Sequence, residues 1–360
     1  MIRGDGIFKF PPVGLGLHRH DNQGMKIFRG HQHSQLALEC ALTIGNFDGV
    51  HRGHQAMLAL LKNEARHLGI PSCAVTFEPH PRDYFAARAG KPELAPARIA
   101  TLRDKLGELE RCGIDQCVIL PFNARLASKL PEAFIQEVLL SGLGARYVLV
   151  GDDFRFGARR AGDYALLDAS GKQLGFDVAR MNSYEVGNTR VSSSAVRAAL
   201  AQGDMARTAS LLGRPYSISG HVVHGRKLGR ELGFRTLNLR FAHWKPAASG
   251  IFAVQVHGLA GYSLAGVANL GIRPSIDPDD VNGGRVLLET HCLDWPASLG
   301  GEGAYGKIIK VEMLHKLHDE LKYDGLESLM TGIARDCEDA RTFFASMHLE
   351  NVRQPTRDPA

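Results

Sequence analysis

The sequence lacks any long apolar run, and this absence argues against a membrane-spanning helix. No segment of the 360 residues approaches the roughly 18 consecutive apolar residues that such a helix requires. Hydrophobic residues make up 44% of the chain and charged residues 22%, which is ordinary for a globular protein. We therefore expect no membrane partner, and the length predicts two domains or one large one.

Paired cysteines are also missing. The chain has 6 cysteines, which are scattered in mostly apolar surroundings without a C-x-x-C pair: Cys40, Cys73, Cys112, Cys117, Cys292 and Cys337. Spacing of this kind gives no disulfide framework and no zinc motif. It predicts reduced, buried thiols in a cytoplasmic protein.

The chain has no dense block of Lys and Arg and no basic, aromatic-rich strand. The formal net charge is +5, with 16 histidines. Single-strand nucleic-acid binding requires aromatic stacking platforms along a basic groove, so we expect no nucleic-acid partner. A mildly basic chain is typical of a protein whose substrates are anionic nucleotides.

Residues 1–24 show no periodicity. They also lack the apolar segment and cleavage site of a secretory signal. We expect them to be a disordered extension, or an artefact of an upstream start codon.

The most informative stretch is Leu42–Gln55, which reads L-T-I-G-N-F-D-G-V-H-R-G-H-Q. A short strand leads through a glycine loop to two histidines at a helix start, where backbone N–H groups and the helix dipole favour a phosphate. The alternatives are a hairpin turn at Asp48-Gly49 and a metal site at the His-x-x-His pair. The hairpin is disfavoured because apolar residues recur at helical spacing after the loop, at Met57, Leu61, Ala65 and Leu68. The metal site is disfavoured because the sequence offers no third ligand nearby.

The first half of the chain alternates predicted strands and helices, which indicates a doubly wound parallel sheet. Expected strands are 41–44, 73–77, 116–120, 147–150 and 176–179, and expected helices are 54–68, 98–111, 131–141 and 194–201. Such sheets bind ligands beyond the carboxyl ends of their strands. Polar or glycine-rich motifs follow four of the strands, and a serine-rich motif opens the last helix: 45–54, 78–82, 122–123, 151–157 and 192–197. Each motif alone could be a turn or a helix cap. Because all of them are expected at one edge of the sheet, we expect a single binding site there.

After Gly213-Arg214-Pro215 the pattern changes to period-2 strands separated by glycines. Strands expected at 216–223, 251–256, 263–270, 286–291 and 307–314 predict a small antiparallel barrel, followed by an amphipathic helix at about 326–344. This half contains no Walker-type phosphate loop. By that criterion alone it would not be assigned as a kinase.

The run G-N-F-D-G-V-H-R-G-H resembles the His-x-Gly-His nucleotidyltransferase signature of bacterial bifunctional riboflavin kinase/FAD synthetases. The resemblance covers about residues 25–341, and Met25-Lys26-Ile27-Phe28-Arg29-Gly30 is similar to the family's usual beginning. It implies an FMN adenylyltransferase domain at 25–213, a riboflavin kinase domain at 214–348 and a tail at 349–360. The implied reactions are phosphorylation of riboflavin to FMN, and AMP transfer from ATP to FMN, which gives FAD and pyrophosphate.

In the first domain, hydroxyls at a helix start can bind phosphate, and an arginine one turn later can neutralise it. The resemblance implies catalytic roles for His51, His54 and Arg197. ATP contacts are expected at Gly45, Asn46, Phe47, Asp48, Gly53, Ser192, Ser193 and Ser194. Flavin contacts are expected at Pro79, Phe122, Asn123, Asp153, Phe154 and Phe156.

In the second domain, the resemblance implies that 225–234 is the kinase loop, with ATP contacts at Gly225, Lys227, Gly229 and Gly233. Thr236 and Asn238 are two apart on an extended chain and project to one face, so they can share a Mg²⁺ ion; they could instead satisfy backbone groups at a strand start. Glu289, within an apolar strand, is implied as the general base for the riboflavin 5′-hydroxyl. The structural alternative pairs it with a base.

Two departures from the family pattern concern the kinase half. Arg235 stands where the family usually has proline, and we predict that it adds a phosphate contact. His318 replaces arginine in Leu317-His318-Asp319-Glu320. The alternatives are therefore an adenylyltransferase with a weak or inactive kinase domain, and a flavin-binding regulatory protein. We expect a monomer or weak homo-oligomer.

Overall fold

The computed structural model describes residues 24–224, 234–240, 245–273, 285–300 and 302–353. Most of the predicted extension, 1–24, lies outside these residues, as do Gly225, Lys227, Gly229 and Gly233. The chain forms two compact units, which are described separately. The first comprises Met1–Pro96 with Lys105–Val191, and the second Ala97–Asp104 with Ser192–Ala360.

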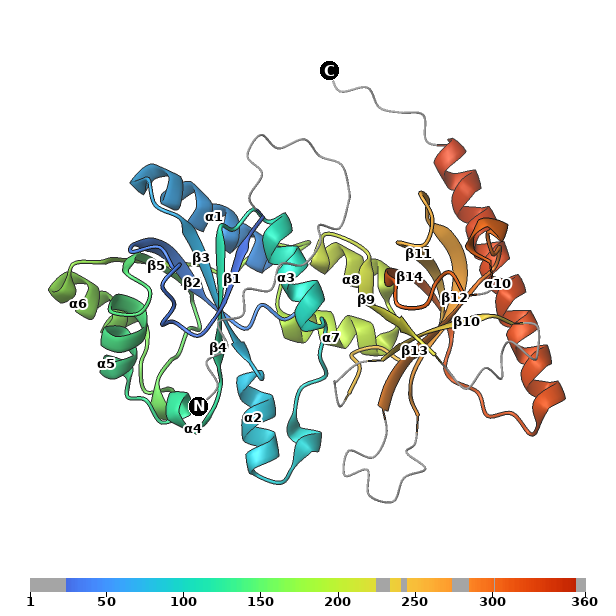
Figure 1. The fold of residues 1–360 in the computed structure, drawn as a ribbon, viewed down its shortest axis with the longest axis horizontal. Coiled ribbons are helices and arrows are strands. Elements are labelled where there is room, and N and C mark those ends of the chain that lie inside the picture. Colours follow the sequence, from blue (N-terminus) through green and yellow to red (C-terminus); the bar gives the residue numbers. More distant parts are fainter. Residues whose placement is uncertain (1–23, 225–233, 241–244, 274–284, 301, 354–360) are drawn as a thin grey trace. The chain divides into compact units, whose positions relative to one another are not determined.

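The first unit is built on a six-stranded parallel sheet with the strand order β1-β4-β3-β2-β5-β6 (Figure 1). Its strands are β1 (Lys26–Arg29), β2 (Cys40–Ile44), β3 (Ser72–Glu78), β4 (Gln116–Pro121), β5 (Ala145–Gly151) and β6 (Asp177–Met181). The predicted doubly wound sheet is thereby confirmed. Four predicted motif loops follow β2, β3, β4 and β5, and parallel strands place these loops at one edge.

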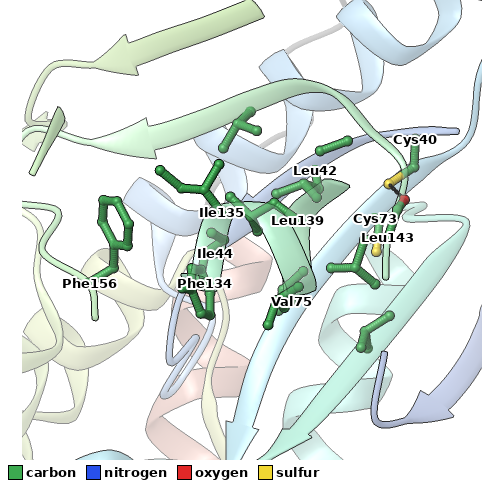
Figure 2. Close-up of a cluster of buried hydrophobic side chains, with 14 of the residues drawn as sticks. Cys40, Leu42, Ile44, Cys73, Val75, Phe134, Ile135, Leu139, Leu143 and Phe156 are labelled. Carbon is green, nitrogen blue, oxygen red and sulfur yellow. Dashed lines mark hydrogen bonds between the residues drawn. The ribbon is translucent and has the colours of Figure 1, made fainter. Parts of the chain in front are cut away.

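Successive residues of each strand face opposite sides of this sheet. On one side, Leu42 and Val75 pack in a buried cluster with the π-helical segment η2 (Phe134–Leu140) (Figure 2). On the other side, Thr43 donates a hydrogen bond to Met57 of α1 (Arg52–Leu68) at 3.1 Å. The hydrophobic core therefore lies on both faces of the sheet, and helical segments cover it.

Further helices connect the strands: α2 (Pro81–Arg88), η1 (Pro92–Leu94), α3 (Leu102–Arg111), α4 (Ala124–Ala127), α5 (Pro131–Ala133), η3 (Ala158–Arg160) and α6 (Tyr164–Leu174). β7 (Glu185–Val186) and β8 (Thr189–Arg190) form a small hairpin. Helices α2 and α6 were not predicted from the sequence. The N-cap of α6 is Asp163, which accepts from the Leu166 N–H at 3.0 Å, and its C-cap is Gly175 with φ 84°.

The second unit contains α7 (Ser193–Gln202), α8 (Met205–Leu212) and a closed antiparallel barrel with the strand order β10-β13-β12-β11-β14-β9 (Figure 1). The strands are β9 (Tyr216–Val223), β10 (Thr236–Arg240), β11 (Gly250–His257), β12 (Leu264–Arg273), β13 (Arg285–Cys292) and β14 (Ile308–His318); η4 (Ala297–Leu299) is a single turn. The predicted barrel is confirmed.

The final helix α10 (Leu326–Arg353) packs on the outside of the barrel, also as predicted. Cys337 and Ala340 of this helix lie in a buried cluster with Ile251, Ala253 and Val267 of β11 and β12. Within the described ranges, no helix is both long and apolar enough to cross a membrane. All six cysteines are free thiols, and all except Cys112 are buried.

Candidate active sites

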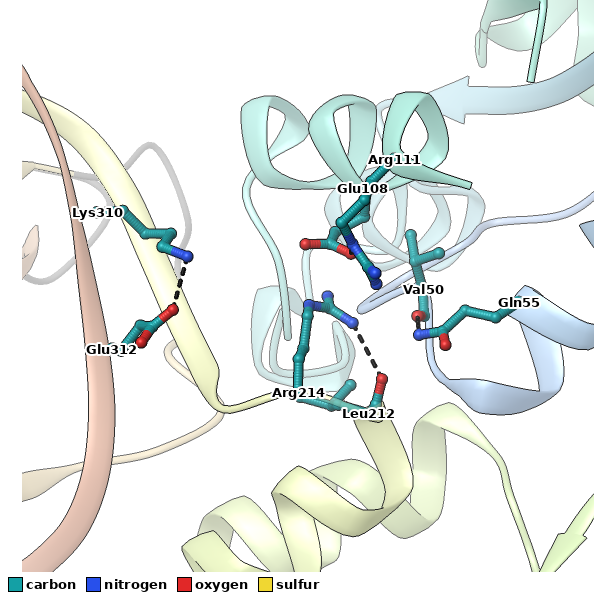
Figure 3. A network of polar contacts seen from close by, with 8 residues as sticks. All are labelled: Val50, Gln55, Glu108, Arg111, Leu212, Arg214, Lys310 and Glu312. Carbon is teal, nitrogen blue, oxygen red and sulfur yellow. Dashed lines mark hydrogen bonds and ion pairs between the residues drawn. The ribbon is translucent and has the colours of Figure 1, made fainter. Parts of the chain in front are cut away.

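The loop after β2 is held in an unusual backbone conformation. The Gly45 N–H donates to the Val75 carbonyl at 3.0 Å, which continues the sheet pairing for one more residue. Phe47 and Val50 then adopt positive φ angles of 48° and 41°, although neither is glycine and both are fully buried. Positive φ is costly for bulky side chains and concentrates at functional sites. The Gln55 side chain braces the loop by donating to the Val50 carbonyl at 2.8 Å (Figure 3).

The loop leads into α1, where the two predicted histidines lie against one another. Their rings are stacked with centroids 3.7 Å apart and an angle of 15° between the planes. His51 is the N-cap of the helix, and its Nδ1 accepts a hydrogen bond from the His54 N–H at 3.3 Å. When the ring is neutral, its proton is therefore on Nε2, which can act as a donor. A Cβ on Gly53 would lie 3.3 Å from the His51 ring, so this glycine permits the close stacking.

His54 is held in its neutral form. Burial, the neighbouring His51 and the cation of Lys105 lower the pKa of His54 well below its usual range. Its Nδ1 is buried and has no hydrogen-bond partner in the part of the chain that the structure describes. A neutral imidazole can still donate one N–H, which is what stabilisation of a phosphate oxygen requires.

Lys105 of α3 is a neighbour of this site that the sequence analysis missed. It is only 1% exposed, and its Nζ donates to Thr76 Oγ1 at 3.3 Å. The Thr76 hydroxyl donates in turn to the Asn46 carbonyl at 3.3 Å. The ammonium group is thus connected to the histidine loop through β3. Buried lysines are rare, but the sequence of α3 gave no sign that this lysine would face inward.

The loops after β3 and β4 bring the predicted residues Pro79, Phe122 and Asn123 to the same edge of the sheet. Phe122 packs edge to face with three aromatic rings, those of Phe77, Tyr84 and Phe85, at centroid distances of 5.7, 5.4 and 5.7 Å. Asn123 is the N-cap of α4 and accepts from the Leu126 N–H at 3.1 Å. Its carbonyl oxygen therefore already has a structural role.

The residues predicted after β5 differ in exposure. The Asp153 side chain is exposed and lies 3.6 Å from the Arg190 guanidinium. Phe154 stacks on Phe156 with centroids 5.4 Å apart, but Phe156 is buried in the core cluster against Phe134. Phe154 and Asp153 therefore offer an aromatic face and a hydrogen-bond acceptor, whereas Phe156 packs against Phe154 within the core.

The serine-rich motif opens α7 in the second unit. Ser192 is the N-cap, and its Oγ accepts from the Ala195 N–H at 3.2 Å. Ser193 and Ser194 form the first turn, where helix N–H groups lack helical acceptors. Arg197 lies one turn later, and its Nε donates to the Ala97 carbonyl at 2.6 Å.

In the barrel, the predicted kinase residues lie on adjacent strands. Asn238 of β10 lies directly opposite Glu289 of β13, and Thr236 lies opposite His291. The Asn238 amide nitrogen donates to the Thr236 carbonyl at 3.5 Å, whereas its Oδ1 is buried without a hydrogen-bond partner among the described residues. An orphaned buried acceptor beside a carboxylate fits a hard cation, because Mg²⁺ prefers oxygen ligands.

Asn269 of β12 is a second residue that the sequence analysis missed. It lies directly opposite Glu289, on the side away from Asn238. Its Oδ1 is likewise buried and without a partner in the described part of the chain. The only sequence signal was an asparagine within an apolar strand, which by itself does not reveal which residues lie beside it.

Arg235 has contacts within the protein. Its guanidinium lies 4.5 Å over the Trp295 ring and donates to the Gly300 carbonyl at 2.8 Å. The Trp295 indole N–H donates to the same carbonyl at 2.9 Å. Arg235, which directly precedes β10, thus links the start of that strand to the segment before β14.

His318, the second departure, pairs with the final helix. Its Nε2 lies 2.8 Å from Oδ1 of Asp336, and its Nδ1 lies 2.7 Å from the Asp319 carbonyl. Partial burial lowers the pKa of His318, but the hydrogen bonds to Asp336 and Asp319 outweigh burial, so this pKa is raised above its usual value.

Comparison with known proteins finds a matching family model for each half of the chain. Residues 33–195 match the family model described as FAD synthetase, and residues 212–344 match the model described as riboflavin kinase. A bifunctional riboflavin kinase/FMN adenylyltransferase from Haemophilus influenzae is 40% identical over 323 residues, which cover 89% of this chain and 100% of that protein. The protein of the same description from Escherichia coli (strain K12) is 44% identical over 322 residues, with 89% and 98% coverage.

A solved structure described as a macrolide-efflux protein from Streptococcus pneumoniae is also similar. It has a TM-score of 0.69 and 24% identity, and the match covers 88% of this chain and 98% of that one. At this level of identity the likeness concerns the fold alone.

Proposed function

The chain belongs to the bifunctional riboflavin kinase/FMN adenylyltransferase family, and from this premise we propose which residues carry each reaction. The FAD synthetase domain is N-terminal and the flavokinase domain is C-terminal. Both reactions use ATP. We assign domain bounds of 25–213 and 214–348, with riboflavin, FMN and ATP as substrates and FAD as the final product. We further propose a monomer or weak homo-oligomer.

For adenylyl transfer, we propose that His51 and His54 donate hydrogen bonds to the ATP phosphates. The observation that supports this most directly is the stacked histidine pair at the N-terminus of α1. Donors fixed before the reaction stabilise charge that develops on phosphate oxygens without reorganising. Gly45, Asn46, Phe47, Asp48 and Gly53 shape the backbone around the same phosphates.

We assign Ser192, Ser193, Ser194 and Arg197 to ATP binding. The positive end of the helix dipole at the start of α7 and the guanidinium one turn later suit a polyanion. We assign Pro79, Phe122, Asn123, Asp153, Phe154 and Phe156 to the FMN side. Of these, Phe154 and Asp153 offer an aromatic face and an acceptor, and Phe156 acts through Phe154.

For riboflavin phosphorylation, Thr236 and Asn238 would hold Mg²⁺, since the Asn238 Oδ1 is buried without a partner among the described residues, while its amide nitrogen donates to the Thr236 carbonyl. When bound, the ion would neutralise charge on the ATP phosphates. Glu289 accepts the proton of the riboflavin 5′-hydroxyl, and Asn238 keeps its position through the Thr236 carbonyl. We assign to ATP, from the family resemblance, four positions outside the described residues: Gly225, Lys227, Gly229 and Gly233.

The test is to remove each reaction separately. With riboflavin, ATP and Mg²⁺, His54→Ala should accumulate FMN without FAD, because loss of one transition-state donor costs ~10²–10³ in turnover. Glu289→Gln should leave riboflavin largely unchanged yet convert supplied FMN to FAD, because loss of a general base costs ~10²–10⁴. Chromatography of the flavins measures both outcomes.

Matched controls come from the same helix and the same barrel. His67→Ala removes an exposed histidine from the last turn of α1. Glu312→Gln removes a barrel carboxylate whose Oε1 lies 2.6 Å from Lys310 Nζ (Figure 3). Both controls should keep both activities. A folded His54→Ala protein without kinase activity, or a folded Glu289→Gln protein with normal kinase activity, would contradict the assignment.

A further inference from the structure

Asn269 has a buried side-chain oxygen without a hydrogen-bond partner among the described residues. Folded proteins rarely leave a buried acceptor unpaired, because the desolvation is then uncompensated. Asn269 belongs to a strand interior, where an apolar residue of similar size would avoid this cost. A bound ligand that donates a hydrogen bond would supply the missing partner.

The strand register defines what lies beside Asn269. Asn269, Glu289 and Asn238 are directly opposite one another on three adjacent strands, β12, β13 and β10. Directly opposite residues project to the same face, with Cβ atoms about 5 Å apart. Leu270 and Leu288, the next residues along two of these strands, are fully buried and project to the opposite face. The three polar side chains therefore form one row on one face of the barrel wall.

The two asparagines flank the carboxylate from opposite sides. On one side of Glu289, Asn238 contacts Thr236, and these two residues are the pair assigned to the Mg²⁺ ion. On the other side of Asn269 the next opposite residue is Ile251 of β11, which is buried in the cluster beneath α10. Asn269 thus combines one acceptor with an apolar neighbour. This combination suits a ligand that carries hydroxyl groups on an apolar ring system.

We propose that Asn269 accepts a hydrogen bond from a ribityl hydroxyl of riboflavin and binds the flavin instead of the metal ion or ATP. The proposal rests on the assignment of Glu289 as the base at the 5′-hydroxyl. With that hydroxyl at Glu289, the adjacent hydroxyls of the same chain fall within one strand spacing, about 5 Å. The ring imide, the other donor of the flavin, lies at the far end of the molecule.

The proposal is tested with two flavins that differ in the ribityl chain. In lumiflavin, a methyl group replaces the ribityl chain of riboflavin. Quenching of flavin fluorescence gives Kd for each flavin with wild type, Asn269→Ala and Asn269→Leu. We expect Kd for riboflavin to rise roughly three- to tenfold, as for loss of one hydrogen bond, and Kd for lumiflavin to stay unchanged. The KM for ATP and the conversion of supplied FMN to FAD should not change.

Thr290→Val is the matched control. The Thr290 hydroxyl is also buried and unpartnered in the described residues, but it is next to Glu289 in the chain and therefore faces the opposite side of the strand. This variant should bind both flavins as wild type does. The Leu variant keeps the side-chain volume, so it carries the test if the Ala variant fails to fold.

The outcomes separate Asn269 from Glu289. Equal weakening of both flavins, no weakening of either, or a raised KM for ATP with normal riboflavin binding would overturn the role of Asn269. If the Asn269 variants lose affinity for riboflavin alone while the Glu289→Gln protein remains fully active, the hydroxyl contact of Asn269 is supported. Only the assignment of Glu289 as the base is then wrong.

Discussion

His51 and His54 are chemically identical side chains three residues apart, yet their surroundings give them different properties. His51 caps the helix through Nδ1, so its ring is fixed by a hydrogen bond to the backbone. His54 has a buried Nδ1 without a partner in the described structure and a cation nearby. Two stacked imidazoles cannot readily both be charged, because like charges repel strongly at this separation.

We therefore expect His54 to remain neutral well below pH 6.5. Burial, His51 and Lys105 all lower its pKa, and His51 and Lys105 are the titratable groups whose charge acts on it. An unfolded histidine binds a proton near pH 6.5, so this residue reduces stability as the pH falls below that value towards the folded pKa. Imidazole NMR titration, with His54→Gln for assignment, measures the folded pKa directly.

Lys105→Met supplies the control for this electrostatic explanation. Without the cation, the folded pKa of His54 should move upward towards 6.5, and the acidic limb of FAD formation should move with it. An unchanged His54 titration in a folded Lys105→Met protein would remove Lys105 as a cause.

His318 should show the opposite pH dependence. Its pKa is raised by Asp336 and Asp319, with Asp339 contributing in the same direction. Its stabilising contribution is therefore full below the unfolded pKa of about 6.5 and is lost as the pH rises through the folded pKa. The pair is partly exposed, so we expect the effect to be below about 1 kcal/mol.

Urea denaturation at pH 6 and pH 8 measures this contribution. His318→Arg keeps a permanent charge and should remove the pH dependence, whereas Asp336→Asn should lower stability at pH 6 and have less effect at pH 8. Equal pH dependence in wild type and Asp336→Asn would show that the pair does not contribute.

At the scale of elements, the segment before β14 contacts a side chain that directly precedes β10. Arg235 stacks on Trp295, and both side chains donate to the Gly300 carbonyl. The guanidinium we predicted to contact phosphate thus has an intramolecular role that requires no ligand. A proline at this position would lose both contacts.

We expect Arg235→Ala to loosen this segment. Cation–π contacts at exposed sites contribute about 0.5–1 kcal/mol, so the barrel should be destabilised by about that amount. In a Trp244→Phe background, Trp295 becomes the single tryptophan, and its fluorescence should shift towards that of a solvated indole. Arg235→Lys should give a smaller shift, because lysine cannot stack as a plane. An unchanged spectrum in Arg235→Ala would exclude the contact.

At the scale of the whole molecule, the first strand that the structure describes begins directly after the predicted extension. β1 starts at Lys26, whose N–H donates to the Asp115 carbonyl at 2.9 Å, and Phe28 is buried against the sheet. A chain that begins at Met25 should keep both activities and its melting temperature.

A chain that begins at His31 is the informative comparison. It would lose Phe28, and deletion of a buried phenylalanine side chain alone costs about 3–5 kcal/mol. Its first unit should therefore melt earlier. Loss of either activity in the chain from Met25 would show that the first residues contribute to function.

The sequence alone determined the parallel sheet, the barrel and the order of the two halves. These follow from local patterns: strand and helix periods alternate before Gly213, and period-2 strands follow it. Because parallel strands carry their following loops to one edge, the positions of the motifs after β2, β3, β4 and β5 could also be predicted. The short edge strand β1 and the helices α2 and α6 were missed, because their patterns are weak and their stability comes from packing.

Only the tertiary structure decided which side chains meet. Asn269 and Asn238 flank Glu289 because three strands pair in one register, and a shift of one residue would turn each side chain to the other face. Lys105 reaches the histidine loop through Thr76, 29 residues away in the chain, and His318 meets Asp336 through packing of α10 on the barrel. No local pattern encodes such contacts, because burial and register are set by segments that are distant in sequence.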